Sequence, residues 1–463
     1  MSATLLIAVA IAACGGDKPS PAQLPITLPG PSPTPSTIHP STTPLPTATF
    51  SAGQVILPTV NVTVGVPTPI SDDPINELLA GIALRVNLIR ELTTLEKQDA
   101  AYITQADYLD RITQDLEKDR KNIDALGQLY TLLGILRPTQ DLFGILANLY
   151  GETVLGFFDR DQSRLYVVKD LETFGPAEFV TYAHEYTHFL QQQYFDFSSQ
   201  LDDLKDESDE LRAYLALLEG DATLTESIYM LQYLSDEERQ IIQEAPAERI
   251  ISALQAAPHV VRRTYFFPYV EGFQFAYGLF LSSGWAGVDH AFRDPPRSTE
   301  QVMHPDKYLL GELPIEISLP DLATTLGPDW RLLREDSLGQ FVLMAYLETA
   351  LEPIEALEAA SGWGGDRYAV VEGPEGEVLA AWLVSWDSEG DATEFFDGYV
   401  NFLAILTGFS WEPSATPGSR TMLLPDRTVR FSIDGLSTML AVSTNSTALD
   451  TVIDALEDAG KMP

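Results

Sequence analysis

The 463-residue sequence predicts an α+β protein that is mainly helical. From residue 75 onward, apolar side chains recur at spacings of three and four, which is typical of helices. A β-prone segment at 152–168 is divided by turn residues, and beyond about residue 335 helices alternate with paired strands. We therefore expect a large helical domain with a small β-hairpin over 75–335, followed by a small α+β domain over 336–463.

Composition excludes several classes of function. The chain has 28 Lys and Arg against 67 Asp and Glu, a formal net charge of −39. A nucleic-acid-binding protein needs a basic face to neutralise phosphate, so we expect no nucleic-acid partner. The single cysteine excludes a disulfide framework and any metal site built from several cysteines.

The first fourteen residues predict a lipoprotein signal peptide. Leu5 to Ala13 is an apolar stretch of signal-peptide length, too short to span a membrane. It leads into Ile11-Ala12-Ala13-Cys14-Gly15, which resembles the lipobox of bacterial lipoproteins, although residues 1–4 lack the usual Lys or Arg. The resemblance implies export, lipidation of Cys14 and anchoring to the outer face of the bacterial cell membrane.

Residues 15–74 predict an extended tether between that anchor and the folded body. Fourteen of the 31 prolines lie here, among Ser, Thr and other small residues. Because proline removes backbone donors and favours polyproline II, we expect this segment to form no packed core.

The helical domain begins with a clear amphipathic segment. Apolar residues from Leu78 to Leu92 predict a first helix, a second is expected over 99–121, and shorter ones over 122–150. A hairpin follows, with strands near 152–158 and 164–168. Gly175-Pro176 then opens the next helix, since proline is well tolerated in a first helical turn.

That helix carries the motif His184-Glu185-Tyr186-Thr187-His188, an H-E-x-x-H sequence. Residues four apart share one helix face, so the two imidazoles can bind one metal ion. Zinc lowers the pKa of a bound water to about 7, and Glu185 can take the proton. The alternative is a pair of core histidines, but the apolar flanks would then bury two imidazoles and a carboxylate without partners.

A catalytic zinc site needs a third protein ligand, and Glu219 is the best candidate. It lies in the apolar helical segment Leu217-Leu218-Glu219-Gly220-Asp221-Ala222, after a polar loop expected over 194–207. Gly220 costs about 1 kcal/mol in a helix interior, which close approach of the two ligand helices would explain. Asp221 is predicted to accept a hydrogen bond from one imidazole, or to be an ordinary solvated acid.

These motifs resemble the gluzincins, the thermolysin-like zincin metallopeptidases with two His ligands and one Glu ligand. The gap between the two motifs is longer than in thermolysin. The likeness is closer to uncharacterised bacterial lipoproteins with a gluzincin-type core, over roughly 75–463, and it includes the segments 297–308 and 363–368. The family implies a zincin-like domain, with a strand beside the active-site helix that pairs with an extended peptide. The 152–168 hairpin could supply that strand or be purely structural.

Gluzincins also use a His or Tyr outside the ligand set to bind the oxyanion that forms during peptide hydrolysis. His304 is the preferred catalytic candidate here, because it lies in a polar motif away from an obvious core stripe. The other candidates are Tyr269, which a turn at Pro268 could position, together with Tyr277, His259 and His290.

The C-terminal domain is predicted as helix, two strands, helix, two strands, helix. The expected ranges are 340–351, 368–371, 378–384, 392–406, 429–433, 438–442 and 448–459. The sequence shows no nucleophile triad, phosphate loop or metal cluster there. We expect this domain to assist folding, substrate placement or partner binding.

The sequence thus predicts a membrane-anchored, Zn²⁺-dependent peptidase that acts on a peptide or protein substrate. One alternative is a non-catalytic surface binding lipoprotein that retains a zincin scaffold, although a scaffold would not need Glu185. A zinc hydrolase of another amide or ester is the second alternative.

Overall fold

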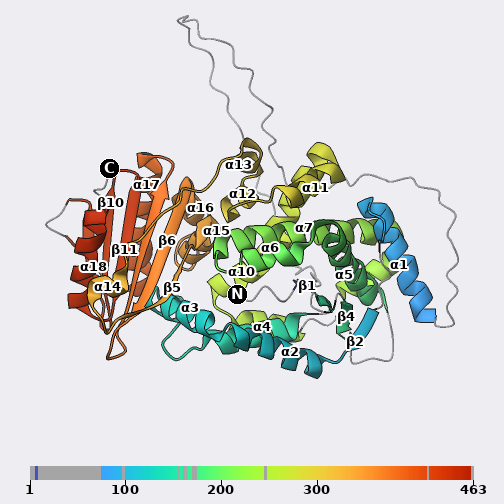
Figure 1. Ribbon diagram of the computed structural model, residues 1–463, viewed down its shortest axis with the longest axis horizontal. Helices are drawn as coiled ribbons and strands as arrows, with labels where there is room; N and C mark the ends of the chain where they lie inside the picture. The colour runs from blue at the N-terminus through green and yellow to red at the C-terminus, as the bar shows by residue number, and fades with distance from the viewer. Residues whose placement is uncertain are drawn as a thin grey trace, which may run out of the picture.

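In the computed structural model, a helical part and a β-sheet part lie side by side (Figure 1). The structure describes residues 6–8, 74–95, 100–154, 156–159, 162, 164–168, 175–244, 248–413 and 417–459. Cys14 and nearly all of the predicted tether lie outside these residues. Among the residues described, no helix is both long enough and apolar enough to cross a membrane.

The helical part begins with α1 (Pro74–Arg90), where the first helix is predicted. The expected helix over 99–121 is wrong at its start, because Ala100–Ile103 forms strand β2. Helix α2 begins only at Gln105, after Thr104 accepts a hydrogen bond from the Asp107 amide as its N-cap. Three helices fill the region up to the hairpin: α2 (Gln105–Lys118), α3 (Arg120–Leu132) and α4 (Leu142–Thr153).

The predicted hairpin is confirmed as β3 (Gly156–Asp159) and β4 (Arg164–Val168), although α4 takes up the first residues of the expected strand. These strands belong to a four-stranded sheet in the order β1-β3-β4-β2. Strand β2 pairs parallel to β4, and β1 (Leu6–Ala8) pairs antiparallel to β3. Residues 6–8 therefore occupy the edge of β3.

Three long helices form the centre of the helical part: α5 (Pro176–Phe195), α7 (Ser208–Tyr233) and α10 (His259–Ser283). Helix α5 starts at Gly175-Pro176 as predicted, and the Glu178 carboxylate accepts from the Gly175 amide at 2.8 Å. The expected 194–207 loop instead contains a short helix, α6 (Phe197–Asp203). Five further helices complete this part: α8 (Asp236–Gln243), α9 (Glu248–Ala256), α11 (Trp285–Arg293), α12 (Thr299–Met303) and α13 (Pro305–Leu310).

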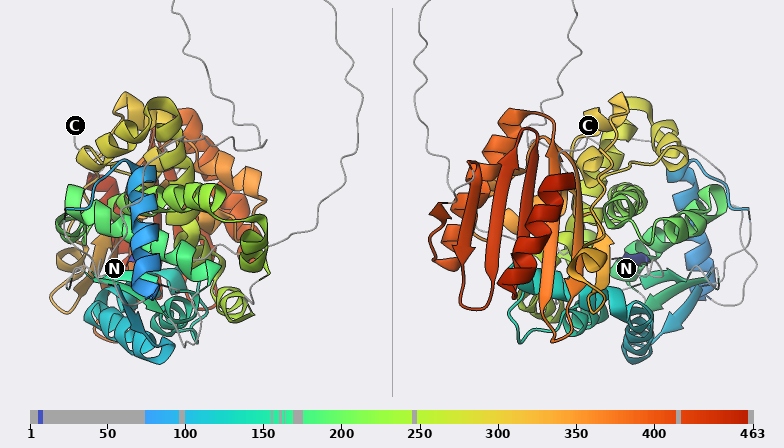
Figure 2. Two further views of the ribbon diagram at one scale, coloured as in Figure 1. Left: turned by 90° about the vertical axis from the view of Figure 1, so that its right-hand side faces the viewer. Right: turned by 60° about the vertical axis from the view of Figure 1, so that its left-hand side comes forward.

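The sheet part is a seven-stranded antiparallel sheet in the order β5-β6-β7-β11-β10-β9-β8, seen face-on in Figure 2. Its strands are β5 (Arg331–Asp336), β6 (Trp363–Glu372), β7 (Val378–Trp386), β8 (Glu412–Pro413), β9 (Ser419–Leu423), β10 (Thr428–Asp434) and β11 (Ser437–Ser443). The sequence correctly predicts β6, β7, β10 and β11 and misses the others. Its helices are α14 (Leu322–Leu326), α15 (Gly339–Leu347), α16 (Pro353–Ala360), α17 (Glu389–Thr407) and α18 (Ser446–Ala459).

Successive side chains along each strand point to opposite faces of this sheet, and both faces are buried. Tyr368 and Val370 of β6 join the main hydrophobic core, which continues without a break into α1 of the helical part. Ala369 and Val371 face the other way, into a second cluster beneath α14 and α18. The two predicted domains therefore share one core. Because β5 starts at Arg331, the sheet part begins before the predicted boundary at residue 336.

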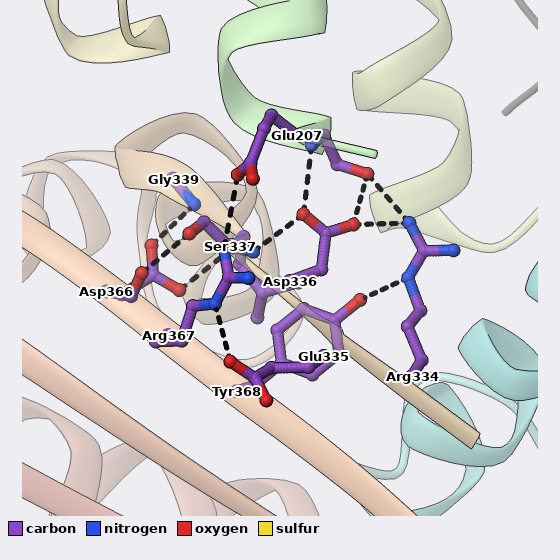
Figure 3. Close-up of polar contacts among 11 residues, drawn as sticks. Glu207, Arg334, Glu335, Asp336, Ser337, Gly339, Asp366, Arg367 and Tyr368 are labelled. Carbon is purple, nitrogen blue, oxygen red and sulfur yellow. Dashed lines mark hydrogen bonds and ion pairs between the residues drawn. The ribbon is translucent and has the colours of Figure 1, made fainter. Parts of the chain in front are cut away.

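A polar cluster joins the edge of the sheet to the start of α7 (Figure 3). Asp336, the last residue of β5, accepts hydrogen bonds from the Ser208 backbone amide at 2.9 Å and from its hydroxyl at 2.5 Å. Arg367 of β6 also pairs with Glu207 at 3.1 Å. The sheet thus supplies the acceptor that the first turn of α7 needs.

Candidate metal centre

Helix α5 places both motif histidines on one face, deep inside the helical part. The side chains of His184 and His188 are at most 1 % exposed. Their ring centroids lie 4.9 Å apart, with the ring planes at 78°. Two imidazoles held edge to face in this way can direct one nitrogen each toward a common point.

Glu219 of α7 completes the group, as the sequence predicts. Its Oε2 atom lies 3.1 Å from His184 Nε2 and 3.4 Å from His188 Nε2. The three prospective ligand atoms all lie within 4.8 Å of one another, and all three residues are buried. Two imidazole nitrogens and one carboxylate oxygen are the donor set of a catalytic zinc site.

Gly220 has the close helix contact that the sequence suggests, but with a different helix. A Cβ at Gly220 would collide with the backbone carbonyl of Gly272 in α10, and a Cβ at Gly272 would collide with the Ala216 carbonyl. Helix α10, and not α5, therefore explains this glycine. The contact fixes α7, and with it Glu219, against the helix that carries Tyr269.

The outer nitrogen of His184 is held by Glu226, a residue to which the sequence analysis assigns no role. His184 Nδ1 lies 2.9 Å from Glu226 Oε2, seven residues beyond Glu219 on the same face of α7. Because a carboxylate only accepts, this hydrogen bond places the imidazole proton on Nδ1. Nε2 is then the nitrogen that faces Glu219 and the centre of the group, where it can bind a metal ion once it has lost its proton.

The outer nitrogen of His188 is held through an amide. Gln191 Oε1 lies 2.7 Å from His188 Nδ1. Gln191 Nε2 donates to Asp221 Oδ2 at 2.9 Å and to the Leu218 carbonyl at 3.0 Å. The prediction that Asp221 accepts directly from an imidazole is therefore wrong: Asp221 acts one residue further out, through Gln191.

The electrostatics of the group favour a positive charge at its centre. Burial lowers the pKa of His184, but hydrogen bonds and charges from Glu219 and Glu226 outweigh it and raise that pKa to about 10. Burial raises the pKa of Glu219, but His188 and His184 outweigh it and lower that pKa to about 2. The proton of His184 gives the centre of the group its positive charge. A metal ion bound there would supply that charge instead, so metal binding would release the proton.

Glu185 is fully buried next to this group. A Cβ built on Gly156 of β3 would lie 3.1 Å from Glu185 Cγ. Glycine at this position therefore leaves space for the Glu185 side chain beside the strand. The carboxylate of Glu185 is also close enough to raise the pKa of the Tyr108 and Tyr269 phenols, whose burial raises them most. Glu185 thus lies between β3 and two phenols, one step around α5 from the ligands.

Tyr269 is the only one of the five oxyanion-donor candidates that the structure brings to the ligand group among the described residues. Its ring centroid lies 6.5 Å from that of His184. The expectation that a turn at Pro268 positions it is wrong, because Pro268 lies inside helix α10. Of the other candidates, Tyr277 stacks on Phe273 with ring centroids 5.7 Å apart.

The preference for His304 does not fit its position. His304 lies at the junction of α12 and α13, where burial and the Lys307 ammonium lower its pKa. The charges that act on it come from its own segment, and none comes from the ligand group. The remaining histidines are also elsewhere: His259 pairs with Glu348 at 2.8 Å, and His290 is exposed.

A second acidic group is formed by Glu300, Glu312 and Asp387. Its centre is taken by the ammonium of Lys307, which lies 2.8, 2.6 and 2.7 Å from the three carboxylates in that order. This group is therefore an ion-pair cluster that already contains its cation. The 297–308 segment is accounted for by these contacts and by the hydrogen bonds from Thr299 to Asp209.

Sequence reasoning misses Gln191 and Glu226 as partners of the ligands. The available signal is their spacing: Gln191 is one turn after His188, and Glu226 is two turns after Glu219. Spacing alone does not distinguish them from other polar residues on the same helices. The distances given above are what identify them.

Comparison with known proteins gives one match. Residues 330–453 match a family model described as a domain of unknown function (DUF8575). This region contains the seven-stranded sheet, helices α15, α16 and α17 and the first part of α18, and it does not include the ligand group. No curated protein and no solved structure matches the chain.

Proposed function

We propose that this chain is a zinc-dependent peptidase with a zincin-like helical domain, which hydrolyses peptide bonds in a peptide or protein substrate. The observation that carries the proposal is the convergence of His184, His188 and Glu219 ligand atoms within 4.8 Å, next to the buried carboxylate of Glu185. Imidazole together with a single carboxylate suits zinc among the common divalent ions.

The residues present fit that ion. His188 Nε2 is buried and makes no hydrogen bond within the described part of the chain. Its nearest acceptor, Glu219 Oε2, lies 3.4 Å away, and a metal ion between the two would bind this buried nitrogen directly. Both outer Nδ1 atoms are hydrogen-bonded to side-chain oxygens, so the inner Nε2 atoms are the ones that would bind the metal ion.

Bound zinc would supply a Lewis acid that lowers the pKa of a water and polarises the substrate carbonyl. In the proposed reaction, the Glu185 carboxylate takes the proton from the attacking water and later gives it to the amine nitrogen that leaves. Tyr269 donates a hydrogen bond to the oxyanion. Burial and the nearby Glu219 carboxylate raise the pKa of its phenol well above the ordinary value, so it remains a donor at neutral pH.

The edge of β3 is the proposed place for the substrate backbone. In the structure this edge pairs with Leu6–Ala8 in antiparallel register. Under the proposed lipoprotein processing, cleavage before Cys14 removes these residues, and the edge becomes free to pair with an extended peptide. The proposed location is the outer face of the bacterial cell membrane, and loss of membrane association in Cys14→Ser would test it.

The decisive experiment is the substitution Glu185→Gln. The amide has nearly the same shape but cannot take a proton, so we expect about one zinc per chain to be retained. Peptide cleavage should fall by about 10²- to 10⁴-fold. Metal content and hydrolysis of a mixed peptide library measure the two properties separately.

Other outcomes would point to the alternatives. Unchanged cleavage by Glu185→Gln would remove the proposed base. A wild-type chain that holds zinc but cleaves no peptide would favour the non-catalytic surface binding protein. Cleavage of esters or non-peptide amides alone would favour a different zinc hydrolase.

A further inference from the structure

Arg90, the last residue of α1, is a fully buried cation at the back of the metal centre. Its Nε donates to Asp221 Oδ1 at 2.7 Å, and its Nη2 donates to Asp289 Oδ1 of α11 at 2.6 Å. The guanidinium carbon lies 4.5 Å from the ring centroid of Trp285. Two carboxylates and one aromatic face therefore fix the guanidinium group of Arg90 in position.

The same contacts continue inward to a ligand. Asp221 Oδ2 accepts from Gln191 Nε2 at 2.9 Å, and Gln191 Oε1 lies 2.7 Å from His188 Nδ1. Arg90, Asp221, Gln191 and His188 thus form an unbroken chain of hydrogen bonds that we call the Arg90 relay. It connects the helix after the predicted tether with the imidazole at the centre of the site.

The relay has a direction set by its donors and acceptors. Arg90 has only donors, so it occupies Oδ1 of Asp221 and leaves Oδ2 to accept from Gln191. Gln191 Nε2 has two acceptors, Asp221 Oδ2 and the Leu218 carbonyl, so its Oε1 atom must face His188. His188 then donates from Nδ1 and keeps the lone pair of Nε2 for the centre of the group.

Arg90 is not needed to attach α1 to the body of the protein. The apolar face of α1 packs into the core through Ile82, Val86 and Ile89, which are at most 2 % exposed. The segment after α1 adds hydrogen bonds with α5, from the Thr93 amide to the Tyr194 hydroxyl at 3.2 Å and from the Leu95 amide to Gln193 at 3.0 Å. A buried ion pair is weak evidence for a stabilising role, because desolvation offsets its attraction.

We propose that Arg90 is a positioning residue for the metal centre, which holds His188 in its ligand orientation through Asp221 and Gln191. This inference rests on the proposed function in one respect, that the ligand group binds a metal ion. It adds α1 and α11 to the elements on which metal affinity depends.

The test uses the full chain with Zn²⁺ and with Co²⁺. We expect Arg90→Met and Gln191→Leu each to raise the zinc dissociation constant by about 10- to 100-fold, as measured by competition with a chelator. Both should also change the visible absorption of the Co²⁺-loaded protein. Because the two residues act in series, the double variant should lose little more than either single variant.

Val86→Ala is the matched control for damage to α1. It shortens a fully buried side chain one turn before Arg90, and that side chain has no donor or acceptor with which to join the relay. It should lower the melting temperature and leave the zinc dissociation constant and the Co²⁺ spectrum unchanged. If the role of Arg90 were merely structural, Arg90→Met and Val86→Ala would have the same effect on the zinc dissociation constant and on the Co²⁺ spectrum.

The proposal is overturned if Arg90→Met binds zinc as the wild type does, if Val86→Ala weakens zinc as much, or if the losses in the double variant multiply. In each of these cases the proposed function still stands, provided that the wild-type protein binds zinc. A wild-type chain that binds neither ion would instead overturn the proposed function, and the relay with it.

Discussion

At the scale of single residues, Tyr269 is recruited to the ligand group from a third helix. It lies 50 residues beyond Glu219 in the chain, yet its ring centroid is 6.5 Å from that of His184. Burial, together with the carboxylates of Glu219 and Glu185, keeps its phenol protonated by raising the pKa. A protonated phenol is a hydrogen-bond donor, so Tyr269 has the chemistry that the proposed oxyanion contact needs.

We therefore expect Tyr269→Phe to lower kcat for peptide cleavage by about 10²- to 10³-fold without loss of zinc. Steady-state kinetics on one defined peptide, together with metal content, would measure this. Tyr277→Phe is the matched control, because that ring stacks on Phe273 away from the ligands. His304→Asn should also retain activity, and an inactive His304→Asn with an active Tyr269→Phe would restore His304 as the donor.

At the scale of elements, the site depends on how closely α7 and α10 approach. Neither Gly220 nor Gly272 has room for a Cβ, because each faces a backbone carbonyl of the other helix. The start of α7 is held separately, by the Asp336 carboxylate at the end of β5. Helix α7 is thus fixed at its first turn by the sheet and near its middle by α10, and Glu219 lies between the two points of support.

Gly220→Ala should therefore destabilise the protein, although alanine is the better helix former. We expect the free energy of unfolding to fall by about 1–3 kcal/mol, because the helices must separate. Gly278→Ala is the control in α10, where nothing lies within 4 Å of an added Cβ. That change should instead stabilise by up to about 1 kcal/mol. Equal urea-unfolding curves for the two variants would contradict the close contact.

At the scale of the whole molecule, ion pairs add to the shared core that joins the sheet to the helical part. Lys307 of α13 bridges Glu300 of α12, Glu312 and Asp387, the residue after β7. Glu300 is buried, and that burial raises the pKa of its carboxyl to about 7 even though Lys307 opposes the shift. The junction therefore contains a carboxyl group that titrates near neutral pH.

This junction predicts a pH dependence of stability. Between about pH 4.5 and about pH 7, Glu300 is protonated in the folded protein but ionised in the unfolded chain, where its carboxyl has the ordinary pKa of 4.5. The contribution of Glu300 therefore falls as the pH rises through that window. Relative to wild type, Glu300→Gln should gain up to about 3 kcal/mol in free energy of unfolding between pH 5 and pH 8. Urea unfolding at both pH values measures the gain.

Glu312→Gln provides the comparison for that experiment. Glu312 is an exposed acid on the same ammonium, so its removal leaves the buried carboxyl of Glu300 in place. The pH dependence should then persist. A stability difference between Glu300→Gln and wild type that does not change with pH would contradict the assignment to Glu300.

Local sequence patterns were sufficient for the parts of the fold that depend on neighbouring residues. The 3.6-residue periodicity of α1, the Gly175-Pro176 start of α5 and the two apolar segments of β6 and β7 around a Gly/Pro turn are all readable from the chain. Local patterns fail to predict those strands that form because they pair with a strand distant in the sequence. Strand β2 exists because it pairs with β4, and β5 because it pairs with β6.

For the candidate site, the sequence alone places His184 and His188 on one helix face with Glu185 beside them, because four residues make about one helical turn. It also identified Glu219 as the residue that could complete the group. Contacts between helices, which local patterns do not reveal, bring Glu226 and Gln191 to the imidazoles, bring Tyr269 and not His304 close to the ligand group, and place Arg90 behind them. The physical reason is that helical spacing fixes neighbours within one helix, whereas contacts between helices depend on how α1, α7 and α10 pack against α5.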